Sequence, residues 1–281
     1  MPSIHAASQA PNQFVDVAGR RLAYRVLGEG VPMVLCLRFR GVMDDWDPAF
    51  LDGLAEQGFR VHLFDYSGLG HSSGQPTYDP ASLARDTLDL IGALELDKVV
   101  LCGWSIGGVA AQLVHLQAPQ LLSHLVLIGT TPPGQLVKTA EPLFYELAAR
   151  ENDFEDFVHL FFEPASDASR DAAARSAARI AERTDGRCTP VPHAWAAAFL
   201  GEGPRNPAFP LDIALDALKR TTIPILHIGG DHDIIFPVEN WYALNRSLPT
   251  LTLLTYPSAG HGPQLQHPEA SARHIAAFVK G

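Results

Sequence analysis

The sequence predicts an α/β fold, in which helices flank a mostly parallel central sheet and a helical lid is inserted between two strands. Three observations predict it. Short apolar runs rich in β-branched residues recur along the chain. Segments with the apolar spacing of helices separate these runs, which is typical of a sheet covered on both faces. Residues 132–210 interrupt this alternation with a long helical stretch, which indicates an insertion.

The parallel strands are expected at six apolar runs, because each is short and rich in branched residues. These runs are PMVLCL (32–37), RVHLFD (60–65), KVVLCG (98–103), HLVLIG (124–129), PILHIGG (224–230) and LTLLTY (251–256). Ahead of them, FVDVAGRRLAYRVLG (14–28) alternates apolar and polar residues on either side of an Ala-Gly turn. That pattern predicts an opening hairpin.

Helices are expected between these strands, where the spacing of apolar residues becomes helical. Asp79 and Pro80 give a clear start signal, since an aspartate N-cap precedes a proline in the first turn. The expected helices of the core span residues 48–57, 80–94, 105–117, 238–247 and 268–279.

The chain is therefore expected to divide into a core, formed by residues 1–131 and 211–281, and a helical lid at residues 132–210. The expected lid is rich in alanine and carries the aromatic residues Phe144, Tyr145, Phe154, Phe157, Phe161, Phe162, Trp195 and Phe199. Two interpretations stay open. These helices either pack on the core with the aromatics as filling, or form a lid whose apolar face lines a substrate cavity.

Composition and charge argue against several classes of partner. The chain has 281 residues and a formal net charge of -10, which repels nucleic acid and anionic membranes. Its first residues lack the basic and apolar regions of a signal peptide, and no apolar run is long enough to span a membrane. Cys36, Cys102 and Cys188 are widely separated and are expected to be reduced thiols, two of them in buried strands. We therefore expect a cytoplasmic protein, and the sequence leaves its oligomeric state open.

The stretch Gly103-Trp104-Ser105-Ile106-Gly107 matches the pattern G-x-S-x-G and lies between an expected strand and an expected helix. A serine at so sharp a turn has a strained backbone, and the flanking glycines avoid Cβ collisions across the bend. The bend exposes the Ser105 hydroxyl as a nucleophile. The Ile106 N–H opens a helix N-terminus that is able to stabilise an oxyanion. A serine that only caps the helix would need no glycine on either side.

A serine nucleophile needs a base, and the base needs an acid that orients it. Two downstream segments offer these groups: GDHDIIFP (230–237) follows the fifth apolar run, and GHGP (260–263) follows the sixth. Both come after the carboxyl ends of strands, where an open α/β sheet places its site.

These segments resemble those of the α/β-hydrolases. Serine, aspartate and histidine follow one another in the order of that family, and GWSIGG, GDHDIIFP and GHGPQLQHPE are similar to its nucleophile elbow, acid loop and histidine loop. A fourth segment, DYSGLGHS (65–72), resembles the family's D-x-x-G-x-G-x-S turn. The resemblance covers about residues 12–131 and 222–280 and leaves the expected lid outside it.

The resemblance implies a catalytic triad. Ser105 is the nucleophile, His261 is the general base and later the general acid, and Asp233 holds the imidazole tautomer. Asp231 is the rival acid, but the family's acid loops read G-x-x-D-x-x-x-P, and this register selects Asp233. Some relatives take the acid from the loop after the strand that follows the elbow helix. Here that loop, at 130–132, has no carboxylate.

The oxyanion donors implied by the resemblance are the backbone N–H groups of Ile106 and Phe39. The family's usual His-Gly is replaced here by Leu37-Arg38. Two interpretations of Arg38 and its neighbour Arg40 stay open. Either they bind a carboxylate or phenolate of the substrate, as guanidinium groups do well, or they pair with Asp44, Asp45 or Asp47 and fix the loop.

The leading hypothesis is hydrolysis of a carboxylic ester or lactone through an acyl-enzyme on Ser105, with neither metal nor cofactor. Trp104, beside the nucleophile, and the aromatics of the expected lid suggest a hydrophobic or aromatic small-molecule substrate, with Trp104 and Arg38 as candidate substrate-binding residues. Relatives with similar elbows act as C–C bond hydrolases, perhydrolases or cofactor-free dioxygenases, and some are ligand receptors. These alternatives stay open because fold and triad do not determine the reaction.

Overall fold

A computed structural model describes residues 5–281 and contains one eight-stranded sheet in the order β1-β2-β4-β3-β5-β6-β7-β8. The strands are β1 (Gln13–Val17), β2 (Arg20–Leu27), β3 (Val31–Cys36), β4 (Phe59–Phe64), β5 (Val99–Trp104), β6 (Leu122–Ile128), β7 (Ile225–Gly230) and β8 (Leu251–Tyr256). β2 runs antiparallel to its neighbours β1 and β4, and the other neighbouring strands are parallel. The predicted fold class and opening hairpin are confirmed.

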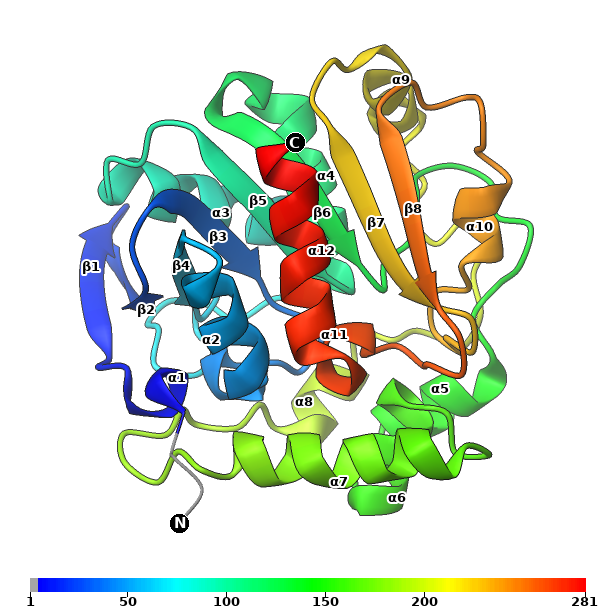
Figure 1. The fold of residues 1–281 in the computed structure, drawn as a ribbon, viewed down its shortest axis with the longest axis horizontal. Helices are drawn as coiled ribbons and strands as arrows, with labels where there is room; N and C mark the ends of the chain where they lie inside the picture. Colours follow the sequence, from blue (N-terminus) through cyan, green and yellow to red (C-terminus); the bar gives the residue numbers. More distant parts are fainter. Residues whose placement is uncertain (1–4) are drawn as a thin grey trace.

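Helices cover both faces of the sheet (Figure 1). On one face α2 (Pro48–Glu56) packs against α12 (Pro268–Lys280), and on the other α3 (Pro80–Ala93) packs against α4 (Ile106–Gln117). The remaining short elements of the core are α1 (Ala6–Gln9), α9 (Asp212–Arg220), α10 (Glu239–Tyr242), α11 (Pro263–Gln266) and the 3-10 turns η1 (Met43–Asp45) and η2 (Pro119–Leu121). No helix of the described chain is both long and apolar enough to cross a bilayer.

One predicted helix is much shorter than expected. The helix predicted over residues 238–247 is a single turn, α10, and turns follow it. Arg246 adopts a positive φ of 69°, which a helix does not accommodate, and Pro249 then leads into β8. Trp241, within α10, packs on the core, and the chain beyond Tyr242 continues as turns.

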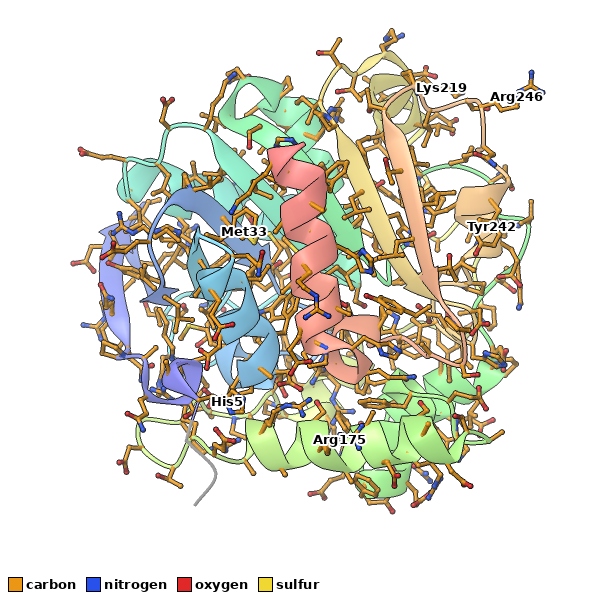
Figure 2. The ribbon with its side chains drawn as sticks, in the orientation of Figure 1. His5, Met33, Arg175, Lys219, Tyr242 and Arg246 are labelled. Carbon is orange, nitrogen blue, oxygen red and sulfur yellow. The ribbon has the colours of Figure 1, made fainter. Side chains whose placement is uncertain are left out.

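The segment between β6 and β7, residues 132–210, is called the inserted segment below. Its helices are α5 (Pro142–Ala148), α6 (Phe154–Phe161), α7 (Asp167–Ile180) and α8 (His193–Ala197). They lie across the edge of the sheet at which β7 and β8 end (Figure 1). In Figure 2, Lys219 and Arg246 mark the opposite edge of the molecule, whereas Arg175 of α7 lies on the inserted segment.

A buried carboxylate joins the inserted segment to the core. Asp47, which is fully buried, accepts the Ala49 N–H as the N-cap of α2. Both its oxygens also receive the Arg179 guanidinium of α7, at 2.7 and 2.6 Å, and Ser176 donates to it at 2.7 Å. Charge-assisted, two-pronged contacts of this kind hold a helix in a defined orientation. The start of α2 and the C-terminal turns of α7 are therefore linked.

Both strand cysteines lie in the core as predicted. Cys36 and Cys102 are fully buried in β3 and β5, and Cys188 is buried in the inserted segment. All three are free thiols. Burial raises the pKa of Cys36 to about 11, so it remains a protonated, unreactive thiol at neutral pH.

Candidate active site

Ser105 lies at the sharp turn between β5 and α4 that the sequence predicted. Its φ of 60° and ψ of -127° lie in a region that side chains rarely adopt. The two flanking glycines are required by the space around this turn. A Cβ on Gly103 would collide with the backbone of Gly107 and Gly108, and a Cβ on Gly107 would collide with the carbonyl of Cys36.

Gly103→Ala is therefore expected to destabilise the protein by about 1–3 kcal/mol, the usual cost of overpacking a rigid site. Gly92 offers the matched control, since it lies in α3 and a Cβ there would meet no atom within 4 Å. Gly92→Ala should leave stability unchanged or raise it slightly. Thermal unfolding of both variants measures the difference, and equal melting temperatures would contradict this account of the turn.

His261 and Asp233 are held together after the ends of β8 and β7. His261 Nδ1 lies 2.8 Å from Asp233 Oδ2, and both side chains are at most 1% exposed. The other carboxylate oxygen of Asp233 accepts the backbone N–H groups of Ile235 (2.8 Å) and Phe236 (2.9 Å). Burial alone would raise the pKa of Asp233, but the neighbouring His261 and these N–H donors outweigh it and lower that pKa. An ionised Asp233 carboxylate therefore lies beside His261 Nδ1.

Asp231, the rival acid, points elsewhere. Its carboxylate lies 2.6 Å from the exposed imidazole of His232. That contact raises the pKa of His232. The carboxylate beside His261 is thus that of Asp233, the residue preferred from the sequence.

The other imidazole nitrogen of His261, Nε2, is buried. Within residues 5–281, Nε2 has no hydrogen-bond partner, and His261 and Ser105 line the same cavity. Hydrogen bonds between base and nucleophile are often long without substrate and tighten when substrate binds. Thr130 supports the turn from behind, since its hydroxyl donates to the Ser105 carbonyl at 2.6 Å.

Trp104 takes a different position from the one expected of a substrate-binding residue. Its side chain is fully buried and lines neither of the two cavities that reach Ser105. Its indole N–H donates instead to the His261 carbonyl oxygen at 2.9 Å. Its ring also packs against Phe161 and the His261 imidazole, so Trp104 supports the histidine loop and forms no part of either cavity wall.

Phe39 and Ile106 lie at the cavity that contains Ser105, as oxyanion donors must. The peptide unit after Phe39 is held at both ends: Arg38 donates to the Phe39 carbonyl at 2.8 Å, and the Arg40 N–H donates to the Tyr78 hydroxyl at 2.7 Å. In the described part of the chain the Phe39 N–H itself makes no hydrogen bond. Tyr78 was missed in the sequence, because no local pattern links it to this loop.

Arg38 and Arg40 fix the structure in different ways. Arg38 pairs with Asp45 at 3.0 Å, and its guanidinium lies over the rings of Trp104 and Phe161. The loop-fixing interpretation therefore describes Arg38, which also remains part of the cavity wall.

Arg40 does not pair with a neighbouring aspartate, which corrects that part of the interpretation. It donates to the carbonyl oxygens of Ala148 (3.0 Å) and Arg150 (2.8 Å) and to the Asn152 side chain (3.1 Å). These acceptors belong to the inserted segment, more than one hundred positions away. Arg40 thus ties the loop to the helices above the site.

Two cavities meet at Ser105. The first, called the polar chamber, has a volume of about 240 Å³ and its wall includes Arg38, Arg40, Asp44, Asp45, Arg187 and His261. The second, called the apolar chamber, has a volume of about 320 Å³ and its wall includes Ile106, Val109, Leu136, Tyr145, Phe199 and Phe209. Phe39, Phe144 and Ile235 line both. The inserted segment contributes side chains to each wall, including Phe144, Phe161 and Phe199 among the aromatics singled out in the sequence.

The segment DYSGLGHS has a structural role that the sequence left undefined. Asp65 is fully buried and accepts the N–H groups of Met43 (2.8 Å) and His71 (2.9 Å). The Cys188 thiol of the inserted segment also donates to it, at 3.3 Å. Asp65 therefore connects the start of η1, its own turn and the inserted segment.

His227 of β7 supports the site as a buried neutral imidazole. It stacks on Trp241, whose indole N–H donates to the Thr130 carbonyl at 2.6 Å. Burial lowers the pKa of His227 from its ordinary 6.5 to about 3. The sequence assigned it no chemical role, and its surroundings agree with a packing role.

This burial predicts a pH effect on stability. Between pH 6.5 and about 3 the unfolded chain binds a proton at His227 and the folded chain does not, so the free energy of unfolding falls as the pH falls. The contribution is up to about 1.4 kcal/mol per pH unit. When the free energy of unfolding is measured by denaturant titration from pH 7 to 4, it should fall less steeply with decreasing pH in His227→Gln than in the wild type. His274→Gln, at an exposed position on α12, should keep the wild-type slope; identical slopes in all three proteins would refute the assignment.

Comparison with known proteins identifies the family. The profile described as alpha/beta hydrolase fold matches residues 31–268. The pimeloyl-(acyl-carrier protein) methyl ester esterase of Nitrosomonas europaea is 29% identical over 243 residues, which cover 78% of this chain and 85% of that protein.

Solved structures agree with this. An alpha/beta hydrolase fold protein from Chitinophaga pinensis superimposes with a TM-score of 0.84 at 29% identity, covering 98% of this chain and 99% of that one. A bromoperoxidase from Bacillus anthracis has a TM-score of 0.72 at 22% identity, covering 96% and 100%, which is a likeness of fold alone. The matched profile spans most of the sheet and the segments around Ser105, Asp233 and His261, and the chain therefore belongs to the α/β-hydrolase fold family.

Proposed function

We propose that the protein hydrolyses carboxylic esters or lactones through an acyl-enzyme formed on Ser105. The observation that carries the proposal is the buried His261–Asp233 pair, whose free Nε2 shares a cavity with the strained serine turn. The name of the Nitrosomonas europaea relative, a methyl ester esterase, supports the choice of an ester bond.

The proposed reaction has two halves. His261 Nε2 takes the proton of Ser105 as its oxygen attacks the carbonyl carbon, and then gives this proton to the departing alcohol oxygen. Asp233 stabilises the imidazolium that forms between these steps. The N–H groups of Phe39 and Ile106 receive the negative oxygen. Water, deprotonated by His261, then releases the acid from Ser105.

The inserted segment is proposed to act as the lid over this site. It contributes wall residues to both chambers, and Arg40 and Asp47 tie it to the core at defined points. The apolar walls support a hydrophobic or aromatic small molecule as substrate.

Turnover of simple aryl and alkyl esters by the purified protein tests the proposal. We expect steady hydrolysis that a fluorophosphonate abolishes by labelling Ser105 at one group per chain. Stoichiometric labelling without turnover would favour a ligand receptor. Oxygen consumption on a heterocyclic phenol that persists in Ser105→Ala would favour a dioxygenase. Either result would overturn ester hydrolysis as the function.

A further inference from the structure

The two chambers can be assigned to the two halves of an ester, an inference that rests on the proposed function. His261 lines only the polar chamber, whereas Ile106 lines only the apolar chamber. His261 has to reach the departing alcohol oxygen, and the Ile106 N–H has to receive the carbonyl oxygen of the acyl group. The alcohol half therefore lies in the polar chamber and the acyl half in the apolar chamber.

The size of the apolar chamber agrees with this assignment. Its volume of about 320 Å³ exceeds the 240 Å³ of the polar chamber. Val109, Leu136 and Phe209 supply the apolar surface that an acyl chain or an aromatic acid buries.

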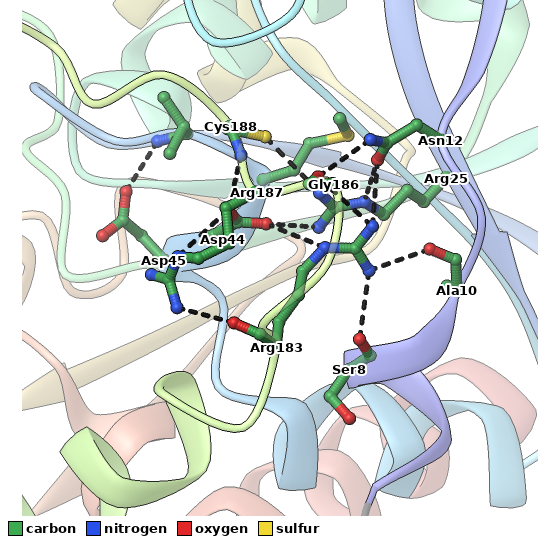
Figure 3. Close-up of polar contacts among 12 residues, drawn as sticks. Ser8, Ala10, Asn12, Arg25, Asp44, Asp45, Arg183, Gly186, Arg187 and Cys188 are labelled. Atoms are coloured by element: carbon green, nitrogen blue, oxygen red, sulfur yellow. Dashed lines mark hydrogen bonds and ion pairs between the residues drawn. The ribbon is translucent and has the colours of Figure 1, made fainter.

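The polar chamber is bordered by a cluster of charged side chains with more guanidinium groups than carboxylates, part of which Figure 3 shows. Asp44 is the common partner of three arginines: Arg25 at 2.7 Å, Arg183 at 3.5 Å and Arg187 at 4.0 Å. Arg25 and Asp44 are buried, so this close pair is largely removed from water. One carboxylate therefore serves three guanidinium groups.

The other charges of this region do not restore the balance. Asp45 is paired with Arg38, and Arg40 contacts only neutral oxygens of the inserted segment. Counting Asp65, the region contains three carboxylates, those of Asp44, Asp45 and Asp65. It contains five arginines: Arg25, Arg38, Arg40, Arg183 and Arg187. The pKa of Arg40 is lowered by burial and by the nearby Arg38. In a chain whose net charge is -10, this chamber is a local concentration of positive charge.

Arg187 is the guanidinium in this cluster that is free to bind a ligand. Its side chain is 46% exposed and lines the polar chamber. Its contact with Asp44 Oδ2, at 4.0 Å, is longer than a hydrogen bond, and that oxygen already accepts the Cys188 backbone N–H at 2.7 Å, while Arg25 contacts Oδ1. Its Nη1 donates to the Arg183 carbonyl at 2.9 Å and to the Ile180 carbonyl at 3.5 Å, and among the described residues its other guanidinium nitrogens make no hydrogen bond.

We propose that the polar chamber binds the alcohol half of an ester whose alcohol carries a carboxylate, and that Arg187 is the specificity-determining residue that recognises it. In the acylation step the bond from Ser105 Oγ to the carbonyl carbon forms and the bond to the alcohol oxygen breaks. That oxygen leaves with the proton that His261 took from Ser105, as the hydroxyl of a free hydroxy acid. The carboxylate takes no part in the bond changes.

Three butanoate esters that differ only in the charge of the alcohol test the proposal: those of glycolate (anionic), glycolamide (neutral and of similar shape) and choline (cationic). For the wild type, kcat/KM is expected to be about tenfold higher for the glycolate ester than for the glycolamide ester, as expected for one hydrogen bond to a charged group. The choline ester should be the poorest substrate. The deacylation rate, measured after a burst, should be the same for all three because they share one acyl-enzyme.

Variants then locate the recognition. Arg187→Gln should bring the glycolate-to-glycolamide ratio close to one by raising KM for the glycolate ester, and Arg187→Lys should keep part of the preference. Arg175→Gln is the charge-matched control, since Arg175 is exposed on α7 and lines neither chamber. It should keep the wild-type ratio.

The possible failures are distinguishable. A wild type that shows no preference for glycolate, or an equal loss of preference in Arg175→Gln, overturns the inference while ester hydrolysis stands. If Arg187→Gln impairs methyl hydrogen succinate, whose carboxylate lies on the acyl half, and spares the glycolate ester, the chambers are assigned in reverse and the inference is wrong. If none of these esters is hydrolysed, the proposed function itself fails and the inference falls with it.

Discussion

Ser105→Ala is expected to lower kcat for ester hydrolysis by at least about 10⁴-fold, the largest effect expected of any single change in this chain. In the proposed mechanism the hydroxyl oxygen of Ser105 receives the acyl group, so the variant should retain only the rate that binding and the oxyanion donors support. Folding should be intact, because the recorded hydrogen bonds of this residue use its backbone: its N–H donates to Ile128 and its carbonyl accepts from Thr130 and Gly108.

Active-site titration and steady-state kinetics with one ester measure this effect, and thermal unfolding checks the fold. Ser247→Ala is a suitable control, since Ser247 is exposed in the turn region that precedes β8. It should retain full activity. If Ser105→Ala hydrolyses the ester at a rate within tenfold of the wild type, the acyl-enzyme mechanism is wrong.

Asp233→Asn is expected to lower kcat by about 10³- to 10⁴-fold, and the structure explains why a nearly identical shape should be so damaging. The N–H groups of Ile235 and Phe236 both point at one carboxylate oxygen, so the asparagine places its carbonyl oxygen there. Its NH₂ group then faces His261 Nδ1 and donates to it. The ring proton is forced onto Nε2, which can no longer accept the proton of Ser105.

The matched control is Asp231→Asn, two positions away. Asp231 is partly exposed and contacts His232 instead of His261, so its replacement should change kcat by less than about twofold. Kinetics of the two variants under one set of conditions distinguish the candidate acids. Loss of activity in Asp231→Asn with retention in Asp233→Asn would reverse their assignment.

The strands and the serine turn were predictable because they depend on neighbouring residues. Branched apolar runs favour extended backbone, and a serine between Gly103 and Gly107 follows a strand only where the chain bends sharply. The predicted helix over 238–247 failed because apolar spacing alone does not detect a residue such as Arg246 with positive φ. The periodicity was present, but the backbone is helical only over Glu239–Tyr242 and continues as turns.

The surroundings of the serine were much less predictable. Trp104 is next to Ser105 in sequence, yet it is fully buried, lines neither chamber and donates to the His261 carbonyl. Arg40 has three aspartates within seven positions, yet its contacts lie in the inserted segment. Nearness in sequence therefore predicted the wrong role for Trp104 and the wrong partners for Arg40.

The sequence by itself determined the order of strands and helices along the chain, the strained turn at Ser105, and Asp233 and His261 as its candidate partners. The tertiary structure decided that Asp233 contacts His261 while Asp231 does not, and that Arg187 borders the polar chamber with one carboxylate shared among three arginines. The physical reason is the distance along the chain over which each kind of interaction acts. Backbone preferences act over a few residues, whereas the chambers are formed by segments as far apart in sequence as Arg38 and His261, which meet only when the whole chain has packed.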